Sequence, residues 1–163
     1  MGYWGSWDDD IKMPKPNSAT YDVASVADRL KSADYIRGFR GSSVCRICQE
    51  RVGSGELTNY EYVFPEGLYH YVEEHEVALP NFLIESLMEE HETNDIQLES
   101  IKRMNEHNLP KDMIHRSGSM INISISSEWS QWLEETGLTN EEALEQYDLT
   151  YSNKRNIERR MGL

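Results

Sequence analysis

Apolar residues recur at the spacing of an amphipathic helix in several stretches of the chain. In residues 21–32 they share one face: Val23, Val26, Ala27 and Leu30. Ser18 or Thr20 stands where a cap for this helix is expected. Further helices are predicted over residues 66–75, 81–91, 96–107, 127–136, 140–147 and 152–161.

Several helix boundaries are marked by residues with a known local effect. Proline lacks an N–H, so Pro65 and Pro80 suit the first turns of the helices that follow them. Gly137 is expected to end a helix that buries Trp129, Trp132 and Leu133. The sequence Thr139-Asn-Glu-Glu142 is a capping box for residues 140–147. Glu99 and Arg103 support the helix over 96–107 as an i, i+4 pair.

Alternation of apolar and polar residues predicts strands. The clearest pattern is Met-Ile-Asn-Ile-Ser-Ile-Ser over residues 120–126, with Ile121, Ile123 and Ile125 on one face. Residues 60–64 alternate in the same way, and a short strand is expected over 43–46. Glycines at 53 and 55 indicate a turn, so residues 53–58 are predicted to form a loop.

The candidate chemistry lies in two cysteines and two histidines. Cys45 and Cys48 are the only cysteines of the chain. Twenty-one residues lie between Cys48 and His70, and four lie between His70 and His75. A Cys-x-x-Cys turn directs both sulfur atoms to one ion, and two-Cys, two-His zinc sites have three to five residues between their histidines. Residues at i and i+5 of a helix point about 140° apart, so both imidazoles reach one ion only if the last turn loosens. We therefore predict one structural Zn²⁺ per chain.

Other interpretations of the same residues fit less well. A redox Cys-x-x-Cys would open a helix, but Gln49-Glu-Arg-Val-Gly is a poor helix former. A disulfide between residues three apart would be strained. Either histidine alone could be an ordinary buried histidine, which is less plausible for both. The remaining histidines, His91, His107 and His115, lie outside the pattern and are interpreted as ordinary surface or helix-end residues.

No catalytic set is visible in the sequence. Four protein ligands would leave no position for a reacting water. The metalloprotease motif His-Glu-x-x-His is absent, and His70-Tyr-Val-Glu-Glu-His75 differs from its inverted form by one residue. The deaminase motifs, a Gly-rich phosphate loop and a serine elbow are absent too. We therefore expect a protein that is not an enzyme.

Part of the sequence resembles a group of small, functionally uncharacterised bacterial and phage proteins. The resemblance covers about residues 1–90 and depends on these segments: Gly2-Tyr-Trp-Gly5, Lys12-Met-Pro14, Cys45-Arg-Ile-Cys48, Gly53-Ser-Gly-Glu-Leu-Thr58, Phe64-Pro-Glu-Gly-Leu-Tyr-His70-Tyr-Val-Glu-Glu-His75 and Leu79-Pro80. The chain departs from that group at Phe64, usually Trp, at Asn59-Tyr60, usually an Asp-Gly turn, and at Tyr69, usually a small residue. The resemblance implies a zinc-finger-like segment and, by analogy, an accessory protein that engages host machinery.

These patterns predict an α+β fold, with a small zinc-finger-like ββα unit embedded in a mainly helical domain with a few short strands. Residues 1–92 are expected to form an N-terminal zinc-binding domain. Residues 93–163 are expected to form a mainly helical C-terminal part that includes the strand 120–126 and packs on the first domain. No apolar run is long enough to cross a bilayer, and no signal peptide is visible. A cytoplasmic protein is therefore expected.

Charge is distributed unevenly along the 163 residues, whose net charge is −13. Residues 54–99 contain twelve acidic residues and no Lys or Arg. The block is either the solvated face of helices or an acidic surface that attracts a basic partner. The chain as a whole lacks the basic character of a typical nucleic-acid-binding protein.

The sequence favours a non-enzymatic zinc-binding protein that acts through protein–protein contacts. Trp4 and Trp7 are expected to pack on the domain or to contact a partner, because exposed tryptophans are costly in water. The alternative is a nucleic-acid-binding zinc finger that uses the basic residues around the cysteines: Arg37, Arg40, Arg46 and Arg51. Against it, helix 66–75 contains three glutamates and no basic residue, so phosphate would repel it.

Overall fold

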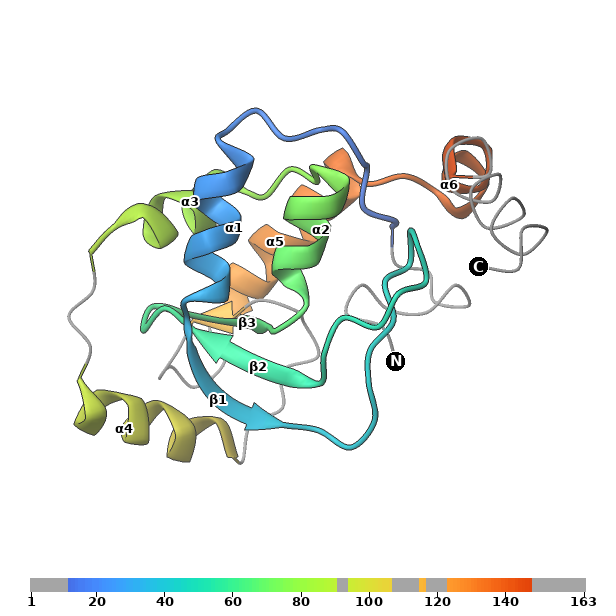
Figure 1. The fold of residues 1–163 in the computed structure, drawn as a ribbon. Helices are drawn as coiled ribbons and strands as arrows, with labels where there is room; N and C mark the ends of the chain where they lie inside the picture. Colours follow the sequence, from blue (N-terminus) through green and yellow to red (C-terminus); the bar gives the residue numbers. More distant parts are fainter. Residues whose placement is uncertain (1–11, 91–93, 107–114, 117–122, 148–163) are drawn as a thin grey trace.

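The computed structural model describes residues 12–90, 94–106, 115–116 and 123–147 (Figure 1). In these ranges the elements follow one another as α1 (Val23–Lys31), β1 (Asp34–Gly38), β2 (Gly55–Thr58), β3 (Tyr62–Pro65), α2 (Leu68–His75), α3 (Asn81–Met88), α4 (Asp95–Glu106), β4 (His115–Arg116), α5 (Ile123–Thr136) and α6 (Asn140–Tyr147).

The strands form one antiparallel sheet in the order β1-β2-β3-β4. Leu57 of β2 is opposite Phe64 of β3, and both side chains belong to the main core with α1, α2 and α3. Val63 points to the other face, where it packs with Ile36 and with Ile101 of α4. The sheet therefore has α1, α2 and α3 on one side and α4 on the other (Figure 1).

The main core joins distant parts of the sequence. Its fully buried side chains include Tyr71, Phe64, Met13, Leu30 and Leu68. Residues of α5 and α6 belong to the same buried cluster, namely Trp129, Leu133, Ala143 and Tyr147. One buried cluster therefore contains residues from both the N-terminal and the C-terminal helices.

A partly buried polar contact joins the Gly53-Ser-Gly55 and Pro65-Glu-Gly67 segments. The Glu66 carboxylate accepts hydrogen bonds from the N–H groups of Ser54 and Gly55, at 3.0 and 2.9 Å. Gly53 has φ +105°, and a Cβ on it would lie only 2.6 Å from the Glu66 carboxylate oxygen. Glycine is required there both for the backbone conformation and for the approach of the carboxylate.

The α+β fold class and the helices expected within the described residues are confirmed, with shifted ends. The capping box is present: Thr139 N donates to Glu142 at 2.7 Å, and Glu142 N donates to Thr139 at 3.2 Å. Gly137 follows the last residue of α5, as predicted. The helix expected over 152–161 lies outside the described residues.

The prediction of a strand over residues 120–126 is wrong for the part of it that the structure describes. Residues 123–126 are the first turn of α5, and residues 120–122 lie outside the described residues. Extending a helix costs less than starting one, so α5 can continue back through a segment that locally has strand periodicity.

Strand positions near the cysteines also differ from the prediction. Residues 53–58 were expected to form a loop but contain β2, and β1 was not expected at all. Both strands contain glycine and charged residues, so they depend on pairing with their neighbours more than on local preference. The strand expected over 43–46 is reduced to one antiparallel bridge, between Val44 and Arg51.

Three local details were also predicted incorrectly. Asp22, not Ser18 or Thr20, caps α1, accepting a hydrogen bond from Ser25 N. Pro65 ends β3, and two turn residues separate it from α2. Glu99 forms its ion pair with Lys102, at 3.0 Å, at i, i+3 spacing. Which residue caps α1 and which basic residue pairs with Glu99 depend on side-chain geometry.

We expect Glu66→Ala to lower the free energy of unfolding by about 1–3 kcal/mol, because two backbone N–H groups lose a charged acceptor. Glu66→Gln keeps one acceptor oxygen and should lower the free energy of unfolding by less. Unfolding in urea measures this free energy for both variants. Glu85→Ala is the control, since Glu85 is an exposed residue of α3. Equal effects of the Glu66 and Glu85 variants would contradict this role.

Candidate metal centre

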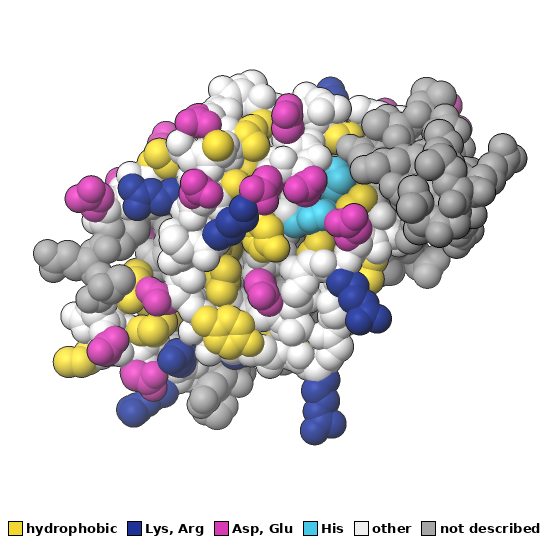
Figure 2. All heavy atoms as spheres, in the orientation of Figure 1, with side chains coloured by type: hydrophobic (Ala, Val, Ile, Leu, Met, Phe, Trp, Pro, Cys, Tyr) yellow, Lys and Arg dark blue, Asp and Glu magenta, His cyan; other side chains and the backbone are white. Residues whose placement is uncertain are grey.

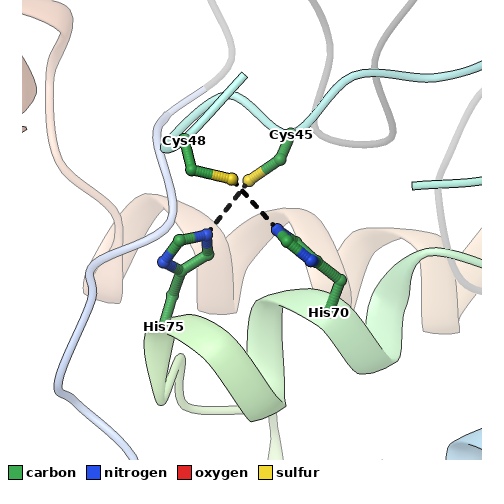
Figure 3. Close-up of side chains that lie close together, drawn as sticks. All are labelled: Cys45, Cys48, His70 and His75. Carbon is green, nitrogen blue, oxygen red and sulfur yellow. Dashed lines mark hydrogen bonds between the residues drawn. The ribbon is translucent and has the colours of Figure 1, made fainter. Parts of the chain in front are cut away.

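The two cysteines lie in a tight turn between β1 and β2. The Val44–Arg51 bridge closes this turn. Within it, Cys45 N donates to Glu50 O at 2.8 Å, and Gln49 N donates to Cys45 O at 2.9 Å. Gln49 has φ 66°, which reverses the chain just after Cys48. Both sulfur atoms therefore point toward α2 (Figure 3). The expected ββα unit is present as β2, β3 and α2, but the cysteines precede this hairpin.

Both histidines lie on α2, and the end of that helix is widened. The N–H of Glu76 is shared between the carbonyls of Val72 and Tyr71, so an i→i−5 contact accompanies the usual i→i−4 bond. Glu76 then adopts a left-handed conformation, with φ 49°. This loosened turn is what the spacing of His70 and His75 requires, and their ring centroids lie 5.0 Å apart.

The four side chains converge on one point (Figure 3). Cys45 Sγ lies 3.3 Å from His75 Nε2, and Cys48 Sγ lies 3.2 Å from His70 Nε2. All four candidate ligand atoms lie within 4.8 Å of one another. A tetrahedral site with common zinc bond lengths has sulfur–nitrogen separations of about 3.5 Å. The group is therefore large enough, and compact enough, to hold one metal ion.

The surroundings of the group exclude most water. Cys45 is fully buried, His75 and His70 are 3% and 7% exposed, and Cys48 is partly exposed. Buried polar side chains need partners. In this site they have one another, and a metal ion would satisfy all four at once.

The two thiols differ in acidity. Burial raises the pKa of Cys45, and its hydrogen bond with Cys48 raises it further. That hydrogen bond lowers the pKa of Cys48 well below that of a free thiol, and His70 and His75 lower it too. Burial opposes protonation of His70, but the hydrogen bond with Cys48 and nearby negative charges leave its pKa raised.

Tyr71 supports the site from α2, and the sequence interpretation did not identify it. Its ring is fully buried, and its hydroxyl accepts a hydrogen bond from Arg46 N at 2.9 Å. Burial raises its pKa, and the neighbouring Cys45 adds to this rise. The N–H of Ile47 also lies 3.4 Å from Cys45 Sγ. These groups orient Cys45, and the position of Tyr71 next to His70 was the only hint in the sequence.

The four donors suit a closed, structural metal site. Thiolate and imidazole ligands favour zinc and similar ions over Mg²⁺ or Ca²⁺. Two sulfur and two nitrogen atoms complete a tetrahedron and leave no open position. The four predicted ligands therefore come together as expected.

The candidate partner contacts have different outcomes. Arg46 is 2% exposed in this structure, and its contact with a partner stays a prediction. It lies inside the Cys-x-x-Cys turn, where its backbone N–H donates to the Tyr71 hydroxyl. Arg40 is exposed and stays a candidate. Trp4 and Trp7 lie outside the described residues, as do His91 and His107, and nothing is described of the His115 side chain.

Acidic side chains surround the exposed part of the site. Figure 2 shows Asp and Glu side chains near histidine atoms at the surface over α2. Glu73, Glu74 and Glu76 are exposed on α2 or at its end, and Glu85 and Glu89 are exposed on α3 or at its end. Lys31 forms an ion pair with Glu73 at 2.5 Å. The acidic block of the sequence is thus largely surface.

Comparison of the chain with protein-family models, with curated proteins and with solved structures gave no match. In the described part of the chain, no helix combines the length and the apolar character needed to cross a membrane.

We expect Tyr71→Phe to weaken binding of a divalent metal about tenfold, because groups that orient a ligand contribute to affinity. Titration with Co²⁺, followed by its thiolate absorption, measures this change. Tyr69→Phe is the matched control, since Tyr69 is partly exposed beside Lys31. Unchanged Co²⁺ affinity in the Tyr71 variant would show that the hydroxyl has no role at the site.

Proposed function

We propose that the chain binds one structural Zn²⁺ through Cys45, Cys48, His70 and His75. The observation that supports this most strongly is the convergence of four soft donor atoms within 4.8 Å in a buried site. Zn²⁺ has no geometric preference beyond what its ligands impose, and it commonly takes two cysteines and two histidines in structural sites. When bound, the ion would supply a cross-link between the cysteine turn and α2.

This cross-link is useful because the cysteine turn has little regular structure. Its two arms are paired by one bridge and a few backbone hydrogen bonds. Apart from the candidate ligands, the turn is held by the hydrogen bond from Arg46 N to Tyr71 and by burial of Ile47 and Val52 in the main core. Metal binding to such a site contributes directly to the free energy of folding. The ion would therefore stabilise the loop against the core without taking part in a reaction.

We further propose that the protein acts by binding another protein, without catalysis. The exposed glutamates of α2 and α3 form an acidic surface, and such surfaces steer basic partners. The resemblance to small phage and bacterial proteins suggests an accessory role that engages host machinery, by analogy. Burial of Arg46 weakens the nucleic-acid alternative, because it removes one of the basic residues that this alternative needs.

Protein purified without chelator should contain close to one zinc ion per chain by elemental analysis. Cys48→Ser should lose the ion, because a hydroxyl does not deprotonate to a ligand at neutral pH. His91→Asn is the control, since its sequence position is outside the ligand pattern, and it should keep the zinc. Absence of zinc in the unaltered protein, even after zinc is added, would contradict the assignment.

The unaltered protein should show no binding to duplex DNA at about 0.15 M salt, because exposed glutamates on α2 oppose a phosphate backbone. Fluorescence anisotropy with a labelled duplex measures this. Sub-micromolar binding that Arg40→Ala abolishes would favour the nucleic-acid alternative over a protein partner.

A further inference from the structure

A segment that contains no helix lies between the candidate metal site and the C-terminal helices. We call residues 12–20 the strap. It passes the C-terminal end of α2 and the segment that joins α5 and α6 (Figure 1). It is held by hydrogen bonds to backbone groups and by burial of Met13, Pro14 and Pro16.

The first end of the strap is bound to the widened turn that carries His75. Asn17 N donates to the carbonyl of His75 itself, at 2.8 Å. The N–H groups of Ser18 and Ala19 both donate to Glu76 O, at 2.9 and 2.8 Å. In return, Ala78 N donates to Ser18 Oγ at 2.8 Å. The carbonyls of a candidate metal ligand and of the residue after it therefore accept three of the hydrogen bonds that hold the strap.

These acceptors lie at the C-terminal cap of α2, where Glu76 N donates to Val72 O at 3.0 Å and Val77 N donates to Tyr71 O at 3.1 Å. The carbonyl of Glu76 faces the strap because Glu76 is left-handed, with φ 49°. The cap hydrogen bonds of Glu76 and Val77 stabilise this left-handed conformation. Coordination of the His75 side chain would further fix the residue whose carbonyl accepts from Asn17.

The other end of the strap holds α6. Met13 and Leu138 exchange two backbone hydrogen bonds, at 2.7 and 2.8 Å, and Met13 is fully buried. The Tyr147 hydroxyl donates a hydrogen bond to Pro14 O. A Cβ on Gly137 would lie 2.5 Å from Lys12 Cβ, so the two segments touch closely.

The strap is an important support of α6. Among the described elements, α6 makes no extensive contact with another helix or strand. Ala143 and Tyr147 are nevertheless buried, and the tyrosine hydroxyl reaches the strap. Loss of the strap would therefore remove a specific anchor of α6 while the sheet, α1 and α2 keep their own contacts.

We propose that metal occupancy controls the docking of the strap and, through it, of α6. This inference rests on the proposed function, because it requires that the site binds zinc. With the ion bound, the widened end of α2 presents its carbonyls and the strap docks. Without the ion, the helix end relaxes, the strap detaches and α6 follows. The metal thereby determines how the exposed Glu141, Glu145 and Leu144 of α6 are presented.

Hydrogen–deuterium exchange of the full chain, zinc-loaded and after chelation, tests this control. We expect amides of the strap, Leu138 and residues 140–147 to exchange at least about tenfold faster after chelation. Amides of β2 and β3 should keep their protection under the same conditions. Addition of zinc should restore the original exchange pattern.

A variant separates the two ends of the strap. Tyr147→Phe removes the hydrogen bond to Pro14 and should speed exchange in α6, with zinc content unchanged and Asn17 to Ala19 still protected. Tyr69→Phe is the control and should alter neither segment.

The outcomes distinguish this inference from the proposed function. If zinc binds but chelation leaves the strap and α6 protected, the inference is overturned and the zinc site stands. If chelation exposes all regions together, the strap is not a specific connection and the inference is likewise overturned. If elemental analysis finds no zinc at all, the proposed function fails and the inference fails with it.

Discussion

The widened C-terminal turn of α2 is the feature on which the site depends. A regular helix would direct His70 and His75 about 140° apart. The ring centroids of His70 and His75 nevertheless lie 5.0 Å apart, at a helix end where the Glu76 N–H is shared between two carbonyls. The same conformation exposes the Glu76 carbonyl to the strap. One local departure from helical geometry therefore serves both the metal site and the packing of the N-terminal segment.

Polar contacts to backbone N–H groups hold the loops around this helix. Glu66 accepts from the N–H groups of Ser54 and of Gly55, the first residue of β2, and Tyr71 accepts from the cysteine turn. Backbone groups left without such partners are costly when buried. The loops near the candidate site are thus positioned by side chains of the neighbouring turn and helix. This arrangement gives the cysteines a fixed position before any ion arrives.

The acidic surface residues and the candidate metal ligands lie in different environments. The acidic residues of α2 and α3 are on the surface, where water solvates them and a basic partner can meet them. The thiol and imidazole groups are turned inward and are mostly buried. A closed set of four ligands suits stabilisation better than chemistry. The proposed protein-binding role and the proposed metal site would therefore occupy different parts of the molecule.

The sequence alone determined the four candidate ligands, because only two cysteines exist and the histidine spacing is restrictive. It also determined the α6 capping box, since Thr139 and Glu142 interact within one helical turn. The tertiary structure decided what depends on distant neighbours: β1 and β2, the helical state of residues 123–126, the burial of Arg46 and the role of Tyr71. Local patterns record preferences within a few residues, whereas strand pairing and burial are set by residues far apart in the chain.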